Sequence, residues 1–349
     1  METPDRVISW PTLGFLWADW TEAHCVVPDR EDAGKPFRLY DDQLWFWCNH
    51  GRIKASAQVG QLSTAFVYRR SQQVLPQKAG KGPLTAAQVC VEAVGPALFA
   101  GFAEPGDFYD CRDHGCGCGW TYDYEPGEPK GRPWPTPLIQ ITATSEEQTA
   151  NIYAALKPMI DDGPLSDVVP KTGEEFIRLP GGGRIDTVTS SATSRLGQRV
   201  TFCAQDETGI WVKQNSMIKV AETQRRGLSC MGGRAVETTN AWDPSQNSVA
   251  QRTYETTVAD VFRMFPQAPK SLSYTNKADR RKIHRLAYGD SLKDRGGHID
   301  LDSIEAEAAE LILVDPAQAE RFYGNRLVEG LGAWLPTGLW EGAYADALA

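Results

Sequence analysis

The chain has 349 residues, of which 41% are hydrophobic and 23% charged, a composition typical of a folded globular protein with one or two cores. It contains no apolar run long enough to cross a membrane and no secretory signal at the N-terminus, so neither secretion by that route nor membrane insertion is expected. The net charge of −9 argues against a passive nucleic-acid coat, although a motor that touches DNA with a few residues remains allowed. Eight cysteines without a signal indicate reduced thiols.

The first elements lead toward a glycine-rich loop. After a Trp-rich extension, residues 1–40, the stretch "YDDQLWFWCNHG" has apolar residues at helical spacing, and "TAFVYRRSQQVL" predicts one or two strands. The stretch "PLTAAQVCVEAVGPALFA" predicts a helix, with Pro83 in its first turn. Strand, loop and helix follow one another as a phosphate-binding loop requires.

Strands and helices alternate in the next part of the chain. A strand over residues 138–143 precedes an amphipathic helix, and "EEFIRLPGGGRIDTVTS" predicts two short strands about a turn. Two further strands, in "RVTFCAQDE" and "GGRAVETTNAW", end in polar residues. This pattern predicts an α/β fold with a mostly parallel central sheet flanked by helices and with ligands at the carboxyl edge. The expected domains are a sheet domain, residues 1–252 with a Gly/Cys-rich insert at 103–134, and a helical segment, residues 253–349.

The loop "VLPQKAGKGP" departs from a Walker A motif at two positions. Gly80 and Lys81 stand where the pattern G-x-x-x-x-G-K-[ST] requires them. Leu75 replaces the first glycine, and Gly82 replaces the hydroxyl residue that holds magnesium. Backbone N–H groups at a helix start bind phosphate whatever the side chains are, so the departures do not exclude a nucleotide site.

The other candidate catalytic and metal-binding residues follow two further predicted strands. Asp206 and Glu207 follow an apolar strand, as in a Walker B element, where one carboxylate holds Mg²⁺ and the next orients and deprotonates water. Thr238, Thr239 and Asn240 end the next strand and have side chains suited to sensing a γ-phosphate.

These motifs, together with "LIQITATSEEQTANIY", "ETTNAWDPSQNSVAQRTYE" and "AERFYGNRLVEGLGAWLP", resemble the large terminase subunit of tailed bacteriophages from about residue 40 onward. That family drives double-stranded DNA into the procapsid by ATP hydrolysis. The resemblance implies a P-loop NTPase fold of ASCE type in which Lys81 binds phosphate, Asp206 holds Mg²⁺, and Glu207 is the catalytic base. It also implies that residues 238–240 form the motif that couples ATP hydrolysis to movement of the DNA.

The resemblance also implies a set of ATP contacts and partners. The expected ATP contacts are Gln43, Pro76, Gln77, Lys78, Ala79, Gly80, Lys81, Gly82, Pro83, Thr238, Thr239 and Asn240. Gln43 corresponds in placement to an adenine-reading glutamine, with a solvent-facing helix residue as the alternative. The implied partners are double-stranded DNA, the portal, the small terminase subunit and a homo-oligomeric ring, expected as a pentamer. The implied location is the host cytoplasm, transiently at the procapsid portal.

An arginine from a neighbouring subunit is also implied, because charge on the transferred phosphoryl group needs a guanidinium. Arg195 fits the expected spacing before Glu207, and Arg199 is the alternative. Many terminases have an arginine after the proline of the loop, where this chain has Gln77 followed by Lys78, which is expected to substitute as the cation. The family's C-terminal nuclease has no counterpart here, so a fragment without nuclease activity is expected, with a separately encoded nuclease as the alternative.

The stretch "CRDHGCGCGW" has four soft ligands, Cys111, His114, Cys116 and Cys118, within eight residues. Such a set can hold Zn²⁺ tetrahedrally, although its spacing is tighter than usual, and reduced thiols in a surface insert are the alternative. A basic group in the helical segment faces either DNA or the portal, or else forms a solvated helix surface. Its members are Arg280, Arg281, Lys282 and Arg285.

Two other functions remain open. A helicase-like or other ASCE translocase would carry a second RecA-like domain, for which the chain after residue 253 is too short. A nucleotide-binding structural protein with an inactive site is conceivable because of Leu75 and Gly82.

Overall fold

The computed structural model describes residues 6–169, 172–173, 176–189 and 199–330. Within these residues the main sheet has seven strands in the order β11-β1-β10-β9-β6-β8-β7. All neighbouring pairs are parallel except β7 with β8, so the predicted mostly parallel sheet is confirmed. The strands are β1 (Arg70–Val74), β6 (Leu138–Thr142), β7 (Phe176–Arg178), β8 (Arg184–Val188), β9 (Phe202–Gln205), β10 (Arg234–Thr239) and β11 (Val261–Met264).

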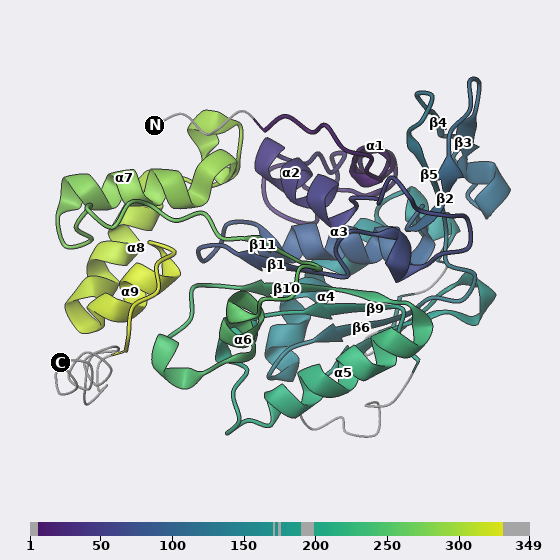
Figure 1. The fold of residues 1–349 in the computed structure, drawn as a ribbon. Helices are drawn as coiled ribbons and strands as arrows, with labels where there is room; N and C mark the ends of the chain where they lie inside the picture. Colours follow the sequence, from purple (N-terminus) through teal and green to yellow (C-terminus); the bar gives the residue numbers. More distant parts are fainter. Residues whose placement is uncertain (1–5, 170–171, 174–175, 190–198, 331–349) are drawn as a thin grey trace.

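Helices cover both faces of this sheet (Figure 1). The helices of the sheet unit are α1 (Gly14–His24), α2 (Asp41–His50), α3 (Lys81–Val94), α4 (Glu146–Asp161), α5 (Met217–Met231) and α6 (Val249–Glu255). α3 and α4 pack together against one face, with α1 on the outer side of α3, while α5 and α6 contact strands of the other face. The result is a three-layer α/β arrangement.

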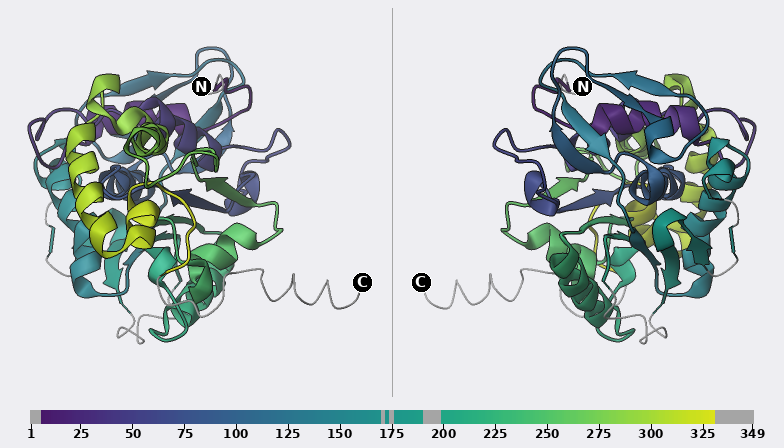
Figure 2. Two further views of the ribbon diagram at one scale, coloured as in Figure 1. Left: turned by 90° about the vertical axis from the view of Figure 1, so that its left-hand side faces the viewer. Right: turned by 90° about the vertical axis from the view of Figure 1, so that its right-hand side faces the viewer.

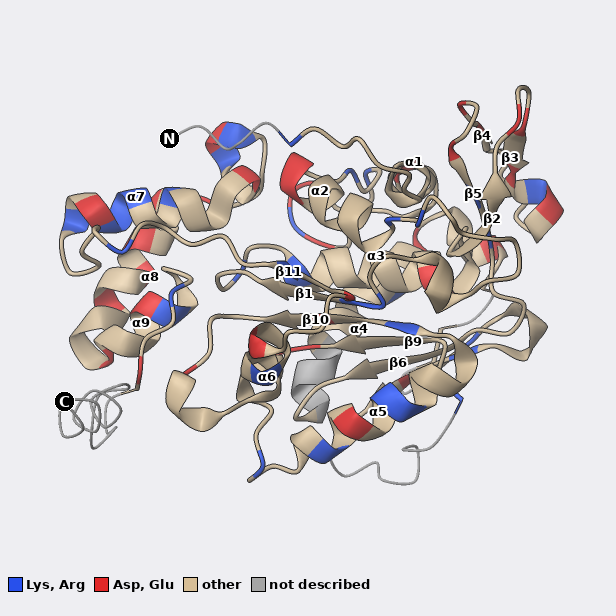
Figure 3. Ribbon diagram, viewed as in Figure 1, with Lys and Arg blue, Asp and Glu red and all other residues tan. Residues whose placement is uncertain are grey.

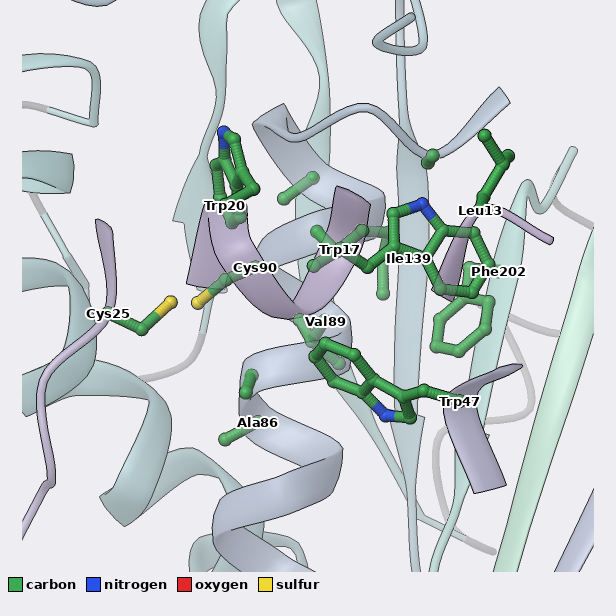
Figure 4. Packing of buried hydrophobic residues seen from close by; sticks show 14 of the residues in the cluster. Leu13, Trp17, Trp20, Cys25, Trp47, Ala86, Val89, Cys90, Ile139 and Phe202 are labelled. Carbon is green, nitrogen blue, oxygen red and sulfur yellow. The ribbon is translucent and has the colours of Figure 1, made fainter. Parts of the chain in front are cut away.

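The largest core lies between the sheet and α1–α4, and tryptophan fills much of it. Trp17 and Trp47 are fully buried, and their rings meet edge to face at 6.3 Å. Figure 4 shows both rings beside Val89 and Phe202, which come from α3 and β9. Aromatic side chains bury a large apolar area each, so the Trp-rich residues before α2 are part of the core. The predicted N-terminal extension is therefore integral to the sheet unit.

A small β insert lies outside the main sheet. It contains two antiparallel pairs, formed by β2 (Leu98–Phe102) with β5 (Pro129–Arg132) and by β3 (Phe108–Asp110) with β4 (Thr121–Asp123). The helix predicted over residues 83–100 is therefore too long. α3 ends at Val94 because Gly95 and Pro96 follow, and Pro96 has no N–H to continue the helical pattern.

The helical segment follows β11 and contains α7 (Lys277–Tyr288), α8 (Leu301–Val314) and α9 (Pro316–Phe322). Figure 2 shows these helices beside one end of the sheet, and the insert lies on the opposite side in Figure 1. The main sheet continues past the boundary predicted at residue 252, because β11 pairs with β1 at the sheet edge. In the described part of the chain after Met264, no further strand joins this sheet.

A buried ion pair connects α3 to β10. Arg234 donates to Glu92 at 2.9 Å, and both side chains are at least 96% buried. Arg234 also lies over the Phe66 ring at 3.7 Å. Removing one partner of such a pair leaves an uncompensated charge, so the pair constrains how the helix after the loop sits on the neighbouring strand.

Candidate active site

The loop after β1 has two residues in the left-handed conformation, Lys78 with φ 68° and Gly80 with φ 87°. Gly80 is the N-cap of α3, and Gly82 and Pro83 lie in the first helical turn, as the sequence predicted. The first N–H groups of a helix have no partner within it and carry partial positive charge. The turn through Lys78 and Gly80 therefore places anion-binding backbone groups at the carboxyl edge of the sheet.

The Lys81 side chain turns back over the loop and is almost fully buried. Its Nζ donates to Leu75 O at 3.1 Å, Pro76 O at 3.0 Å and Asn240 Oδ1 at 2.7 Å. Burial lowers the Lys81 pKa, and the nearby carboxylates oppose this shift. Three oxygen atoms thus satisfy all three N–H donors of a buried ammonium group.

Asp206 and Glu207 follow β9 directly, as predicted. Asp206 is 5% exposed and accepts a hydrogen bond from Thr238 Oγ1 at 2.6 Å. Burial, and secondarily the charge of Glu207, raises the Asp206 pKa to about 6. Glu207 itself has φ 53°, a conformation that costs a non-glycine residue about 1 kcal/mol or more and that occurs often at functional sites.

The strand order places residues 238–240, at the end of β10, between the loop after β1 and the acidic pair after β9. β10 lies between β1 and β9, so its end reaches both the loop and the carboxylates. Asn240 accepts from Lys81 and donates to Glu207 Oε2 at 3.4 Å, while Thr239 O accepts from Leu75 N at 3.0 Å. Lys81, the acidic pair and residues 238–240 therefore meet in one place.

Gln43 lies beside the loop and is buried, so the alternative of a solvent-facing residue is wrong. Its Oε1 accepts from Tyr40 N at 3.0 Å, and a Cβ built on Gly80 would lie 3.5 Å from its Nε2. Sequence reasoning missed two neighbours. The Tyr40 hydroxyl contacts His298 Nδ1 at 3.0 Å, and His298 Nε2 lies 3.1 Å from Lys78 O.

Residues of the helical segment form hydrogen bonds to backbone atoms of the loop between β1 and α3. Gln77 N donates to Phe322 O at 2.7 Å, and the Tyr288 hydroxyl donates to Gln77 O at 2.9 Å. Ser291 Oγ donates to Ala79 O at 3.1 Å. These contacts join residues more than 200 positions apart, and no motif in the sequence marks them.

Of the two candidate arginines, the structure describes only Arg199. Arg195 lies outside the described residues. Arg199 is described and exposed, just before β9.

The basic group of α7 does not form a free cationic surface. Each member pairs with an acid of the same segment, and blue and red residues accordingly alternate in Figure 3. The pairs are Arg280 with Glu305, Arg281 with Asp302, Lys282 with Asp279 and Arg285 with Asp294. Arg280 is also buried, so the simple picture of a solvated helix surface does not hold for it. The ion pairs weaken the case for DNA contact.

The cysteine cluster differs from the prediction in one residue. Cys111, Cys116 and Cys118 lie together, but the histidine beside them is His24 from α1. His114 is not part of this group, because its ring lies against Tyr109 at 4.6 Å. The predicted set that included His114 is therefore corrected.

Comparison with known proteins identifies the fold. No protein-family model matches the sequence. The structure is similar to the HK97 bacteriophage large terminase, with a TM-score of 0.61, 16% identity, and coverage of 95% of this chain and 58% of that chain. The chain has the fold of a phage large terminase. At the level of the fold, this confirms the predicted fold class and the resemblance that the motifs indicated.

Two phage proteins are similar in sequence. The chain is 29% identical over 195 residues to the Gene 13 protein of Mycobacterium phage D29 and 28% identical over 182 residues to that of Mycobacterium phage L5. The matched segments cover 54% and 50% of this chain but only 29% and 27% of those proteins. The chain thus spans well under two thirds of these relatives. Within the described residues, no helix combines the length and apolarity needed to cross a membrane.

Proposed function

We propose that this chain is the ATP-hydrolysing part of a phage DNA-packaging motor. The observation that carries the proposal is the meeting of Lys81, Asp206, Glu207 and Asn240 at the start of α3. A buried ammonium, two carboxylates and a helix N-terminus at one sheet edge suit nucleoside triphosphate hydrolysis. Similarity to the HK97 large terminase supports the specific motor role.

The residues present fit a bound triphosphate. Lys81 is buried, yet its ammonium is satisfied by carbonyl and amide oxygens that phosphate oxygens can replace. The N–H groups that begin α3 would bind the same phosphates. Gln43 and Lys78, on either side of the loop, are the candidates for contacts to adenine and to phosphate respectively.

In the hydrolytic step we assign Glu207 as the base. Its carboxylate takes a proton from water as the water oxygen bonds to the γ-phosphorus. The bond from phosphorus to the β–γ bridging oxygen breaks, leaving ADP and inorganic phosphate. The left-handed backbone at Glu207 and the hydrogen bond from Asn240 fix the position of the carboxylate.

Mg²⁺ bound to the phosphates would offset their negative charge and that of the transition state. Asp206 would hold the ion, directly or through water, and its buried carboxylate gains a favourable partner in doing so. Gly82 contributes no hydroxyl, so we assign the missing contact to water, which Mg²⁺ retains readily. This arrangement makes the departure at Gly82 compatible with an active site.

Charge on the transferred phosphoryl group calls for an arginine, and we assign it to a neighbouring subunit in a ring. Arg195 is the first candidate and Arg199 the second. Such an arrangement ties hydrolysis in one subunit to closure against the next.

We propose that hydrolysis acts on two connected elements. Asn240 contacts both Lys81 and Glu207, and the helical segment contacts the loop through Tyr288 and Phe322. A change in loop conformation after phosphate release would therefore shift α7–α9 directly. Translocation of double-stranded DNA, assembly with the portal and small terminase subunit, and action in the host cytoplasm at the procapsid belong to the same proposal.

The test is ATPase activity with and without duplex DNA in wild type, Lys81→Ala and Glu207→Gln. We expect DNA-stimulated turnover in wild type and a loss of about 100-fold or more in Glu207→Gln, with ATP binding retained. Lys81→Ala should lose binding as well. Glu222→Gln, which changes an exposed acid on α5, is the matched control and should keep full activity.

Two outcomes would favour the alternative functions. A wild-type protein that binds ATP but does not hydrolyse it, even with portal and DNA, would support an inactive structural site. Stimulation by single-stranded but not duplex DNA would favour a helicase-like translocase. A third outcome, equal turnover in wild type and Glu207→Gln, would refute the assignment of Glu207 as the base.

A further inference from the structure

A second cluster of reactive side chains lies in the insert, far from the proposed ATP site in the fold (Figure 1). It combines Cys111, Cys116 and Cys118 from the loop between β3 and β4 with His24 at the end of α1. One ligand atom from each residue lies within 4.8 Å of all the others. Among the described residues this is the group of His, Cys, Asp and Glu whose geometry suits a metal ion.

The histidine is oriented as a metal ligand. His24 Nδ1 lies 2.7 Å from Trp20 O, and a carbonyl can only accept, so Nδ1 carries the proton. Nε2 then has its lone pair free, and it points to Cys118 Sγ at 3.2 Å. A ring nitrogen that donates to a backbone carbonyl while the other faces a metal is the usual arrangement in zinc sites. The ring is held by stacking on Trp20 at 4.6 Å.

The three thiols converge in the same way. Cys111 Sγ lies 3.2 Å from Cys118 Sγ, which is well beyond the disulfide bond length of about 2.05 Å. A tetrahedral site with Zn–S of about 2.3 Å and Zn–N of about 2.0 Å has edges of roughly 3.5 to 3.8 Å. The Cys111–Cys118 and His24–Cys118 separations of 3.2 Å are slightly shorter than these edges, and no two ligand atoms of the group are more than 4.8 Å apart, so side-chain movements of less than about 1 Å would create the tetrahedral shell. Trp120 N–H also donates to Cys118 Sγ at 3.4 Å, a contact that suits a thiolate.

We propose that His24, Cys111, Cys116 and Cys118 bind one structural Zn²⁺ ion that ties the insert to α1. Three soft thiolates and one imidazole favour zinc over hard cations, which prefer oxygen. Four protein ligands fill a tetrahedral shell and leave no position for substrate, so the ion has a structural role. His24 and Cys118 are 94 residues apart, and the ion would join two segments that are otherwise independent in sequence.

The first experiment measures zinc in the purified full chain and records the spectrum of its Co²⁺-substituted form. We expect about one equivalent of zinc, release of that zinc by a thiol-blocking mercurial, and the visible bands of tetrahedral Co²⁺ with thiolate-to-cobalt charge transfer in the near ultraviolet. Chelation should lower the Tm. These measurements use the wild-type chain and do not depend on ATPase activity, so they stand or fall separately from the proposed function.

The second experiment identifies the ligands. His24→Asn and Cys118→Ser should each lose most of the bound zinc, while His114→Ala and Cys230→Ser should keep it. His114 neighbours the cluster and Cys230 is an exposed free thiol elsewhere, so they are matched controls. Absence of zinc and of tetrahedral Co²⁺ bands in wild type, or a Cys111–Cys118 disulfide in the protein as isolated, would overturn the site. Loss of zinc in His114→Ala with retention in His24→Asn would overturn the ligand assignment.

Discussion

Replacing Asp206 by asparagine is expected to stabilise the metal-free, nucleotide-free protein while abolishing ATP hydrolysis. Asp206 is 5% exposed, and burial beside Glu207 raises its pKa from the ordinary value of 3.8 to about 6. Ionisation of Asp206 therefore lowers the free energy of unfolding of the protein. Asparagine has nearly the same shape, carries no charge and can still accept the hydrogen bond from Thr238.

The size of the effect follows from the pKa. At about 1.4 kcal/mol for each pKa unit, the ionised carboxylate costs about 3 kcal/mol of folding free energy near neutral pH. An unfolding entropy of about 2.1 cal/mol/K per residue over 349 residues converts this to a rise in Tm of roughly 4 °C. The cost is fully present above about pH 6 and is lost as the pH falls toward 3.8, where the carboxyl is protonated in both states.

The assay is thermal unfolding of wild type and Asp206→Asn in EDTA between pH 4 and pH 8. The difference in Tm should be largest above about pH 6 and should vanish near pH 4. Asp162→Asn, which changes an exposed carboxylate, is the control and should show no such trend. An Asp206→Asn protein that is less stable than wild type at pH 8, or more stable by the same amount at every pH, would refute the reasoning.

Three further predictions concern the loop and its supports. Gly82→Ser should gain about 0.5 kcal/mol of stability from helix propensity and reach half-maximal ATPase at a lower Mg²⁺ concentration, since a Cβ there meets nothing closer than 3.7 Å; an unchanged Mg²⁺ titration would contradict this. Glu92→Ala should cost about 3 to 5 kcal/mol in denaturant unfolding by leaving Arg234 unpaired, and replacing both by leucine should recover much of it; no recovery would contradict the ion-pair explanation. Tyr288→Phe removes a donor to Gln77 O worth about 1 kcal/mol, so DNA stimulation of ATPase should fall roughly fivefold while basal turnover persists; equal stimulation would argue against coupling through α7.

Much of the site could be predicted because its signals are local. A strand, a Gly-Lys loop and a helix are adjacent in sequence, and Asp206 and Glu207 follow their strand directly. Parallel strands place their carboxyl ends at one edge, so separate motifs at strand ends were expected to meet there. The contact of Asn240 with both Lys81 and Glu207 agrees with that expectation.

The sequence predictions failed where the structure depends on contacts between segments that are far apart in the chain. β11 joins the edge of the sheet only because β1 offers it unpaired backbone groups, so no pattern after residue 252 marked it as part of the sheet. Charge alone did not show that Arg280 of α7 is buried and paired with Glu305 of α8. The acidic partners of the other three basic residues lie on α7, on α8 and in a neighbouring turn. His114 was chosen as a ligand because it is close to the cysteines in sequence.

The sequence alone determined the class of fold and the positions of the Gly-Lys loop and of the acidic pair after their strands, since hydrophobic periodicity and strand-end chemistry act over a few residues. Only the tertiary structure decided that Gln43 is buried beside the loop, that Tyr288 and Phe322 hold the loop's backbone, and that His24 completes the cysteine cluster. Those contacts join side chains and backbone atoms far apart in the chain. They exist because packing of α1–α4 and of α7–α9 against the sheet brings distant segments within hydrogen-bonding distance, which no local pattern encodes.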